Sequence, residues 1–386
     1  MNFQLTEEQE MLRAVTREFA EGEIAPIASR MDEECAIPGE LRKKLRDHNF
    51  FSLLIPEEYG GAGIDQVAYA VVLEELARAS AAVAITVSVH NSVGAAPIQI
   101  FGTEAQKKKW LPLLAREYLG AFALTEPGSG SDAAALITRA ELDGGAYVLN
   151  GSKTFITNGA FADLFLVMAR TSTEQKHRGI TAFLVERNTP GMRIGKSIHK
   201  MGLLASDTTE LIFQDCRVPV ENRLGDEGHG FKVAMQALDG GRIGVAAQAL
   251  GIAQASLDAA ARYSKERSQF GRTISEFQAI QWMIADMATE IEAARLLTLR
   301  AAWLKDQGLP CGPQASMAKL LASRMARVSA DYAVQIHGGY GYTKEFAVER
   351  YYRDAKVTEL YEGTSEIQRI VIAGSILHPK DRKTAK

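Results

Sequence analysis

The chain has 386 residues, 46% of them hydrophobic and 24% charged, and its formal net charge is −3. This composition is typical of globular proteins and excludes long disorder, and the near balance of charge argues against nucleic acid as a partner, because phosphate binding needs a basic excess. The three cysteines, Cys35, Cys216 and Cys311, lie far apart and predict neither a disulfide framework nor a zinc cluster.

Membrane and targeting signals are not expected in this chain. No stretch of eighteen apolar residues is free of charge, so we expect no transmembrane helix and no membrane partner. Residues 1–8 carry acidic side chains where a targeting peptide has a basic segment followed by an apolar one. We therefore expect a soluble protein of the bacterial cytoplasm, or of the mitochondrial matrix if the chain is a mature eukaryotic form.

Residues 1–120 have a helical period, which predicts an N-terminal helical domain. Thr6–Gln9 has the capping-box pattern of a helix start, and an apolar stripe that includes Val15 and Phe19 follows it. A second capping box begins at Thr103. Between these helices, three glycines in residues 60–63 indicate a loop.

Residues 121–228 have a different pattern, in which short β-rich runs alternate with turn residues. The predicted strands are Ala146–Leu149, Lys153–Thr157, Leu164–Ala169, Ile180–Glu186 and Thr208–Phe213. This spacing predicts a small, central antiparallel β-barrel or sandwich domain.

Residues 229–386 return to a helical period with unusually long segments, which we expect to pack as a four-helix bundle. The predicted helices are Ile243–Lys265, Glu276–Asp306 and Pro313–His337. The order of helices, then strands, then helices predicts an α+β fold, mostly α, and disfavours a parallel doubly wound sheet.

One glycine-rich segment resembles a dinucleotide-binding loop but is rejected. Gly128–Ala133 matches GxGxxA, a pattern that functions only where a strand precedes it and a helix follows it. A turn at Asp143–Gly145 comes too soon for that helix to develop. The histidines form no HxH or HxxxH pair, so we also expect no metal site.

Four segments remain as candidates for ligand contacts. Phe122–Asp132 combines glycines, which allow close approach of a planar ligand, with hydroxyls that can donate hydrogen bonds, although an ordinary turn explains the same residues. Ser365 and Gln368 match a capping box, which places Glu362 just outside a helix, where it either reaches a ligand or only favours the helix dipole. Arg267 could bind a pyrophosphate or cap a helix, and residues 335–342 could form a ligand loop or a helix end.

Taken together and in this order, these segments resemble the acyl-CoA dehydrogenase family over essentially the whole chain. The motifs that carry the resemblance are LTEPGSGSD at Leu124–Asp132, KTFITNG at Lys153–Gly159, ERSQFG at Glu266–Gly271, QIHGGYGY at Gln335–Tyr342, RDAK at Arg353–Lys356 and YEGTSEIQR at Tyr361–Arg369. Within the family, the chain is most similar to the short-chain, butyryl-CoA type.

The resemblance implies a reaction and a base. Members of this family convert an acyl-CoA to the trans-2-enoyl-CoA: a carboxylate takes the α proton, and the flavin of FAD accepts the β hydrogen as hydride, because no side chain can accept a hydride. Glu362 matches the position of the base. Some relatives carry the base instead at the position of Gly241, so this chain resembles the group whose base lies near the C-terminus.

The resemblance also assigns ligand contacts. Residues that match contacts to FAD are Phe122, Leu124, Thr125, Gly130, Ser131, Phe155, Ile156, Thr157, Arg267, Phe270, Gln278, Gln335, Gly339, Thr364 and Glu366. Residues assigned to the acyl-CoA substrate are Ser131, Asp239, Arg242, Tyr361 and Gly363. Relatives usually have tryptophan at the position of Phe155, and often Tyr-Cys at that of Phe122-Ala123. Neither difference removes the ring stacking or puts the reaction in doubt.

The expected partners follow from the same resemblance. Because the residues from Arg267 to Gly339 would reach the adenosine diphosphate part of FAD in a neighbouring subunit, we expect a homotetramer built as a dimer of dimers. Electrons would pass to an electron-transferring flavoprotein. The alternatives are an acyl-CoA oxidase, a dehydrogenase for branched or cyclic short acyl groups, and a helical scaffold that has kept the fold without the chemistry.

Overall fold

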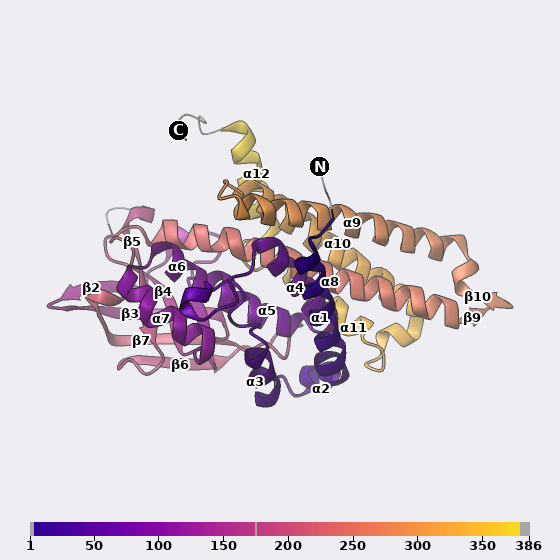
Figure 1. Cartoon of the computed structure of the whole chain (residues 1–386), viewed down its shortest axis with the longest axis horizontal. Coiled ribbons are helices and arrows are strands. Elements are labelled where there is room, and N and C mark those ends of the chain that lie inside the picture. The colour runs from indigo at the N-terminus through magenta and orange to yellow at the C-terminus, as the bar shows by residue number, and fades with distance from the viewer. Residues whose placement is uncertain (1–3, 174–175, 379–386) are drawn as a thin grey trace.

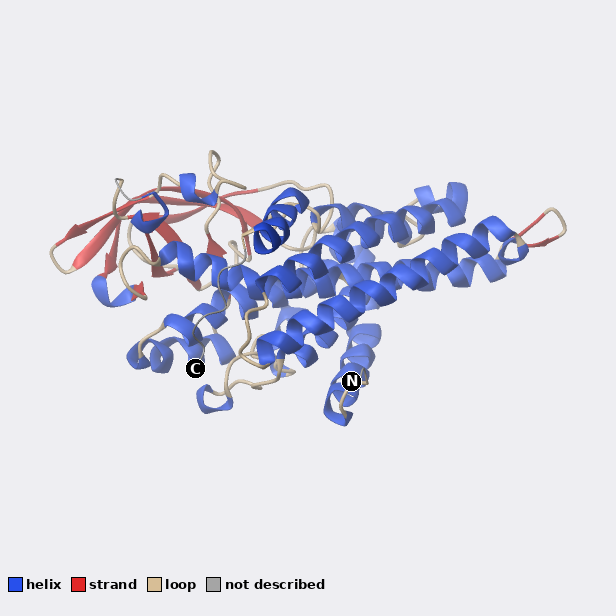
Figure 2. Ribbon diagram, turned by 90° about the horizontal axis from the view of Figure 1, so that it is seen from above, coloured by secondary structure: helices blue, strands red, loops and turns tan. Residues whose placement is uncertain are grey.

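The computed structural model describes residues 4–173 and 176–378. Figure 1 shows a sheet at one end of the molecule and a bundle of long helices that extends to the other end. The N-terminal helices pack along the middle, between these two parts. Figure 2 shows the same separation of strands and helices from above. The predicted fold class is confirmed.

Seven α-helices form the N-terminal part. They are α1 (Glu7–Phe19), α2 (Ala28–Glu33), α3 (Gly39–Asp47), α4 (Gln66–Ala79), α5 (Ala81–Val89), α6 (Ala96–Phe101) and α7 (Glu104–Arg116). Both predicted capping boxes are present: Thr6 and Thr103 each accept a hydrogen bond from the backbone N–H three residues on. Val15 differs from the predicted stripe, because it lies on the exposed face of α1.

One segment in the described part of the chain is long and apolar enough to cross a membrane by length and composition, namely Ala81–Phe101, which comprises α5, a π-helical turn at His90–Ala95, and α6. Residues 81–98 of this segment are buried within the protein. Its composition is that of a central core helix, since every face of it contacts other elements.

The strands form one mixed sheet. They are β1 (Gly120–Ala123), β2 (Arg139–Asp143), β3 (Ala146–Thr157), β4 (Leu164–Arg170), β5 (Ile180–Glu186), β6 (Met192–Ser197), β7 (Thr208–Pro219) and β8 (Arg223–Leu224). The order is β6-β7-β3-β2-β4-β5-β8, with β1 paired to β4. The sequence predicted a purely antiparallel sheet. This is wrong, because β1 runs parallel to β4 and the short contact between β2 and β4 is also parallel.

Two predicted strands are one continuous strand in the structure. β3 runs through both Ala146–Leu149 and Lys153–Thr157, and irregularities in its register with β7 occur on either side of Gly151. Gly151 has φ +149, and a Cβ there would press against Thr138. Gly151, which lies between the two predicted strands, is therefore at a bulge, and the pairing with β7 continues on both sides of it.

The C-terminal part consists of α8 (Gly230–Glu266), α9 (Gln278–Asp306), α10 (Gly312–His337), α11 (Val348–Val357) and α12 (Ser365–Leu377). A hairpin, β9 (Ser268–Gln269) and β10 (Arg272–Thr273), joins α8 to α9. The first long helix begins thirteen residues earlier than predicted, because the glycine-rich stretch around Gly240 is helical and packs closely against its neighbours.

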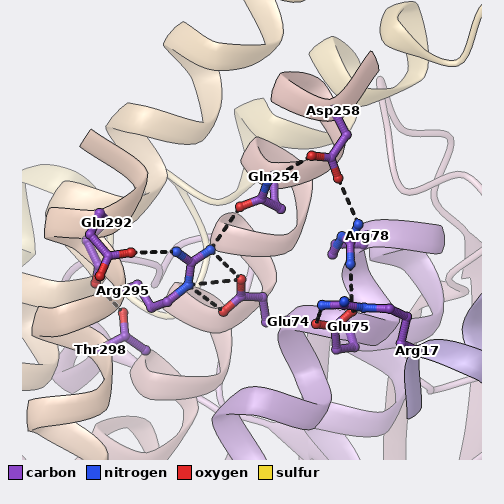
Figure 3. Close-up of polar contacts among 10 residues, drawn as sticks. Arg17, Glu74, Glu75, Arg78, Gln254, Asp258, Glu292, Arg295 and Thr298 are labelled. Atoms are coloured by element: carbon purple, nitrogen blue, oxygen red, sulfur yellow. Dashed lines mark hydrogen bonds and ion pairs between the residues drawn. The ribbon is translucent and has the colours of Figure 1, made fainter. Parts of the chain in front are cut away.

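A network of ion pairs connects α1, α4, α8 and α9 (Figure 3). Glu75, which is buried in α4, accepts hydrogen bonds from Arg17 and Arg78, and Arg78 also pairs with Asp258 of α8 at 2.7 Å. Beside it, Arg295 of α9 donates to Glu74, to Glu292 and to Gln254. These contacts fix the position of α8, which carries part of the candidate site described next.

Candidate active site

Glu362 lies in the connection between α11 and α12, in an unusual backbone conformation. Its φ is +52, a left-handed value that is uncommon outside glycine, and that of Gly363 is +95. Thr364 caps α12 by accepting from the N–H of Ile367, so the capping residue is Thr364 and the predicted Ser365–Gln368 box is wrong. The left-handed turn before the cap directs the chain back over the helical bundle.

The carboxyl group of Glu362 is isolated from polar partners. Its Oε2 is buried and has no hydrogen-bond partner among the described residues. Burial raises the pKa of Glu362 to about 7, and the positive charges of Lys319 and Arg242 oppose that rise. A carboxyl group held in this way is a much stronger base than one in water.

The face of α8 opposite Glu362 has no side chain at the point of closest approach. A Cβ built at Gly241 would overlap Oε2 of Glu362. Glycine inside a helix costs about 1 kcal/mol relative to alanine, so its use here indicates a need for space. The position at which some relatives carry the base is therefore occupied in space by the Glu362 carboxyl group itself.

The resemblance implies that Glu362 is the base, so we expect Gly241→Ala to lower kcat/KM by about 10²-fold, because the added methyl group would displace the carboxyl from its present position. Steady-state kinetics with butyryl-CoA measure the effect. The matched control is Gly374→Ala in α12, where an added Cβ would meet no described atom within 4 Å. Equal activity of the Gly241 variant and wild type would show that the carboxyl does not need its present position.

Arg242 and Asp239, one turn apart on α8, form an ion pair next to Glu362. Their N–O distance is 2.9 Å, and the Arg242 side chain is nearly inaccessible to solvent. Burial raises the pKa of Asp239, although Arg242 opposes this. The Nε of Arg242 is buried without a partner in the described structure, so this guanidinium retains a donor for a ligand.

Tyr361, the residue before Glu362, is hydrogen-bonded to Gln248 of α8. The Tyr361 hydroxyl donates to Oε1 of Gln248, and Nε2 of Gln248 donates at 2.8 Å to the carbonyl of Ala81 at the start of α5. Gln248 lies two turns from Gly241 on the same face of α8. These hydrogen bonds link the residue before Glu362 to α8 and to the start of α5.

The segment after β1 provides an open surface for a planar ligand. Phe122 and Thr125 are partly buried, and Ser131 is exposed. A Cβ built at Gly130 would meet no described atom within 4 Å, so this glycine leaves its face free. Leu124 is buried and packs in the core, which leaves its backbone as the part able to contact a ligand.

The end of β3 lies against this segment. The N–H of Thr154 donates to the carbonyl of Thr125 at 2.9 Å. Phe155 has φ +58 and is 63% exposed, whereas Ile156 is buried and Thr157 is partly buried. An exposed aromatic ring in a left-handed conformation, next to an open glycine loop and free hydroxyls, fits a flavin ring.

A buried ion pair fixes the two segments together. Nζ of Lys153 lies 2.7 Å from Oε1 of Glu126 and 3.0 Å from the carbonyl of Leu124, and both charged side chains are almost completely inaccessible to solvent. Glu126 also accepts from the N–H groups of Ile137 and Thr138. The loop that follows β1 is thereby attached to β3 and to the start of β2.

The core segment α5 and its π-helical turn connect the loop after β1 to the Glu362 site. On one side, Ser88 lies next to Tyr69 and Gly244, which face Glu362. On the other side, His90 accepts from the N–H of Gly120 at 2.9 Å, at the start of β1. The open surface and the buried carboxyl are therefore held by the same rigid helix.

The remaining predicted FAD residues lie elsewhere. Thr364 and Glu366 follow Glu362 closely in the chain. Thr364 caps α12, and Glu366 is exposed. The others lie at or near the ends of α8, α9 and α10: Arg267, Phe270, Gln278, Gln335 and Gly339. This is the hairpin end of the bundle, at the opposite extremity of the molecule from the sheet in both views (Figures 1 and 2).

Residues at this hairpin end are open to solvent. Phe270 has φ +53 and is 94% exposed at the tip between β9 and β10. The Arg267 guanidinium lies 5.8 Å from the centre of the Tyr340 ring. Within one chain, these residues therefore do not lie next to the loop after β1. The two groups of predicted FAD residues are exposed separately, at opposite ends of the molecule.

Several residues of the site were not predicted from the sequence. Lys319 and Gln248 lie inside the long helices α10 and α8 and belong to no recognisable motif, whereas Gln368 lies in the Tyr361–Arg369 motif but was predicted only as part of a capping box. Among the residues that the structure describes, no group of three or more His, Cys, Asp or Glu side chains could hold a metal ion.

Comparison with known proteins agrees with this geometry. Family models described as the N-terminal, middle and C-terminal domains of acyl-CoA dehydrogenase match residues 6–118, 121–216 and 228–377. The chain belongs to the acyl-CoA dehydrogenase family. It is an oxidoreductase, and the cofactor of this family is FAD.

Individual relatives cover nearly the whole chain. A short-chain specific acyl-CoA dehydrogenase of Clostridium acetobutylicum is 50% identical, over 97% of this chain and 100% of its own. The structure of butyryl-CoA dehydrogenase from Megasphaera elsdenii matches with a TM-score of 0.96 and 48% identity, over 98% of this chain and 100% of that one. A chain in a structure of the electron transferring flavoprotein of Acidaminococcus fermentans matches with a TM-score of 0.97 and 51% identity, over 98% and 100%.

Proposed function

We propose that this acyl-CoA dehydrogenase oxidises short-chain acyl-CoA thioesters to trans-2-enoyl-CoA, with Glu362 as the base that removes the α proton. The observation that carries this proposal is Oε2 of the Glu362 carboxyl, which is buried without a hydrogen-bond partner in the described structure, together with the pKa of Glu362, which burial raises to about 7. Near neutral pH such a group is substantially ionised and still basic enough to accept a carbon-bound proton.

FAD supplies the acceptor for the β hydride when it is bound. Phe155, Thr125, Thr157 and Ser131 would hold the flavin part, since they surround the open loop after β1. Arg242 would orient the substrate through its Nε, which has no partner in the described structure, and Gly241 would leave space for the carboxyl because it carries no Cβ.

We propose that the FAD site is completed by a second copy of the chain. The distance between the two ends in Figure 1 supports this, because one molecule exposes the flavin half and the adenosine half at opposite extremities. A dimer of dimers provides each FAD with both halves and gives a homotetramer. Sedimentation of the FAD-loaded protein tests the assembly, and a monomer that binds FAD stoichiometrically would contradict it.

We propose that the hydrogen-bonded pair of Tyr361 and Gln248 forms a barrier that limits the length of the acyl chain and gives a preference for short chains. We expect kcat/KM to be highest near butyryl-CoA and to fall by about 10-fold or more for each methylene that must displace this hydrogen-bonded pair. A turnover profile across straight, branched and cyclic acyl-CoAs measures the preference. If kcat/KM were constant for acyl chains of about four to about twelve carbons, a range of several methylene steps, the proposed barrier would be contradicted.

The acceptor of the electrons is tested in the same assay. We propose an electron-transferring flavoprotein, because one matching structure contains such a protein. Reduction of this flavoprotein or of a dye, without hydrogen peroxide under air, supports a dehydrogenase, while stoichiometric peroxide indicates an oxidase. If the purified protein showed no flavin absorbance after addition of FAD, this result would instead favour a helical scaffold without catalytic activity.

A further inference from the structure

Lys319 is a wholly buried lysine that the proposed reaction leaves without a role. It lies in the middle of α10, is 0% exposed, and its Nζ donates to the carbonyl oxygen of Gly363 at 2.6 Å. Lysine is rarely fully buried, because desolvation of its ammonium group is unfavourable. Its position next to the Glu362–Gly363 turn therefore calls for an explanation.

The carbonyl of Gly363 is held from two sides. Nε2 of Gln368, in the first turn of α12, donates to it at 2.8 Å and to the carbonyl of Glu362 at 3.2 Å. Lys319 reaches the same oxygen from α10. Left-handed backbone conformations cost about 1–3 kcal/mol and persist only where surrounding groups hold them, so these two donors fix the turn that orients Glu362.

The two donors differ in charge. Gln368 is neutral, whereas Lys319 is a cation whose field acts on the Glu362 carboxyl. Arg242 on α8 also faces that carboxyl, but it is paired directly with Asp239, whereas Lys319 donates to an uncharged carbonyl. Of the two cations, Lys319 has the less neutralised charge.

The other titratable groups near Lys319 and Glu362 do not change the conclusion that Lys319 is the less neutralised cation. Tyr69 of α4 and Tyr361 face Glu362, and burial raises the pKa of each phenol, so both stay neutral. Glu359 and Glu366 act on Lys319 from the ends of α11 and α12 and favour its charged form. Burial lowers the pKa of Lys319 to about 8, which keeps it protonated at neutral pH.

We propose that Lys319 is a positioning residue for Glu362: its ammonium group holds the Glu362–Gly363 turn and favours the ionised carboxylate. This inference rests on the proposed function, in which Glu362 is the base. Removal of the cation then raises the pKa of Glu362. The ionised base is populated only at higher pH, so the acidic limb of the kcat/KM profile moves upward.

The test compares variants of the FAD-loaded enzyme that remove the cation with one that removes only a neutral donor. Lys319→Met and Lys319→Gln both remove the charge, and the second keeps a polar group in case the first does not fold. We expect the acidic limb with butyryl-CoA to move up by about one pH unit in either variant. Gln368→Met is the matched control, because it removes a donor to the same carbonyl oxygen and should lower activity at every pH without moving the limb.

A second readout is independent of turnover. Infrared difference spectra follow the protonated carboxyl band of Glu362, assigned by its absence in Glu362→Gln, as pH changes. The band should persist to higher pH in the Lys319 variants than in wild type. Unchanged titration in both Lys319 variants, or an equal shift in Gln368→Met, would overturn the inference. Failure of the proposed function is a different result, in which Glu362→Gln keeps its turnover.

Discussion

Glu362→Gln is expected to lower kcat for butyryl-CoA by about 10²–10⁴-fold, the range contributed by a positioned general base. The amide has the shape of the carboxyl but cannot accept the α proton. FAD content and the far-ultraviolet spectrum should remain those of wild type, because Oε2 forms no hydrogen bond within the described structure whose loss would affect folding. Stopped-flow measurement of flavin reduction isolates the step in which the base acts.

The control for this change is Glu104→Gln in α7, a glutamate away from the candidate site. The Glu104 carboxylate is 69% exposed and is paired with Lys107 at 3.0 Å. We expect this variant to keep kcat within about threefold of wild type, since surface ion pairs contribute about 0–1 kcal/mol. Turnover of Glu362→Gln close to that of Glu104→Gln would remove Glu362 from the mechanism.

The sequence predicts the order of the elements well, because caps and hydrophobic periods are local. Thr6 and Thr103 begin helices as expected, and β5 has the predicted bounds Ile180–Glu186. Short strands such as β1 and β2 were missed, because four or five residues carry too little alternation to be distinguished from loop. Pairing with longer strands gives them their structure, β1 with β4 and β2 mainly with β3, and this pairing is a tertiary effect.

The candidate site was predicted only where motifs mark it. Glu362 and the loop after β1 carry glycines and hydroxyls in recognisable patterns, so they could be found from the sequence. Lys319 lies in an alanine-rich helix, where a lysine usually indicates the solvent-exposed face. Only the packing of α10 against the Glu362–Gly363 turn shows that this lysine is buried.

The two halves of the FAD site illustrate a different limit. The resemblance assigns Arg267 to Gly339 to FAD in a neighbouring subunit, and the fold places these residues at the opposite end of the long axis from the loop after β1 (Figure 1). Local sequence patterns cannot give this separation, because it depends on the direction and packing of the long helices α8 to α10. The fold of a single chain agrees with two separate groups of residues, and their assembly into one FAD site stays a prediction.

The largest expected loss of stability comes from Lys153→Met. This change removes the partner of a carboxylate that is buried in the sheet, and breaking such a pair from one side costs about 3–5 kcal/mol. Burial alone raises the pKa of Glu126, but the Lys153 charge and the N–H of Ile137 outweigh it and hold that pKa below its ordinary value. Without Lys153, Glu126 must therefore either remain charged in an apolar environment or take up a proton.

Thermal unfolding and FAD retention measure this effect. The melting temperature should fall, and FAD should dissociate more readily, because Lys153 also holds the carbonyl of Leu124 next to the flavin loop. The double variant Lys153→Met with Glu126→Gln should recover part of the loss, since no uncompensated charge remains. Lys196→Met, an exposed position in β6, is the control and should change stability by about 0.5 kcal/mol or less. If Lys153→Met were as stable as this control, the buried pair would not be what attaches the flavin loop to β3.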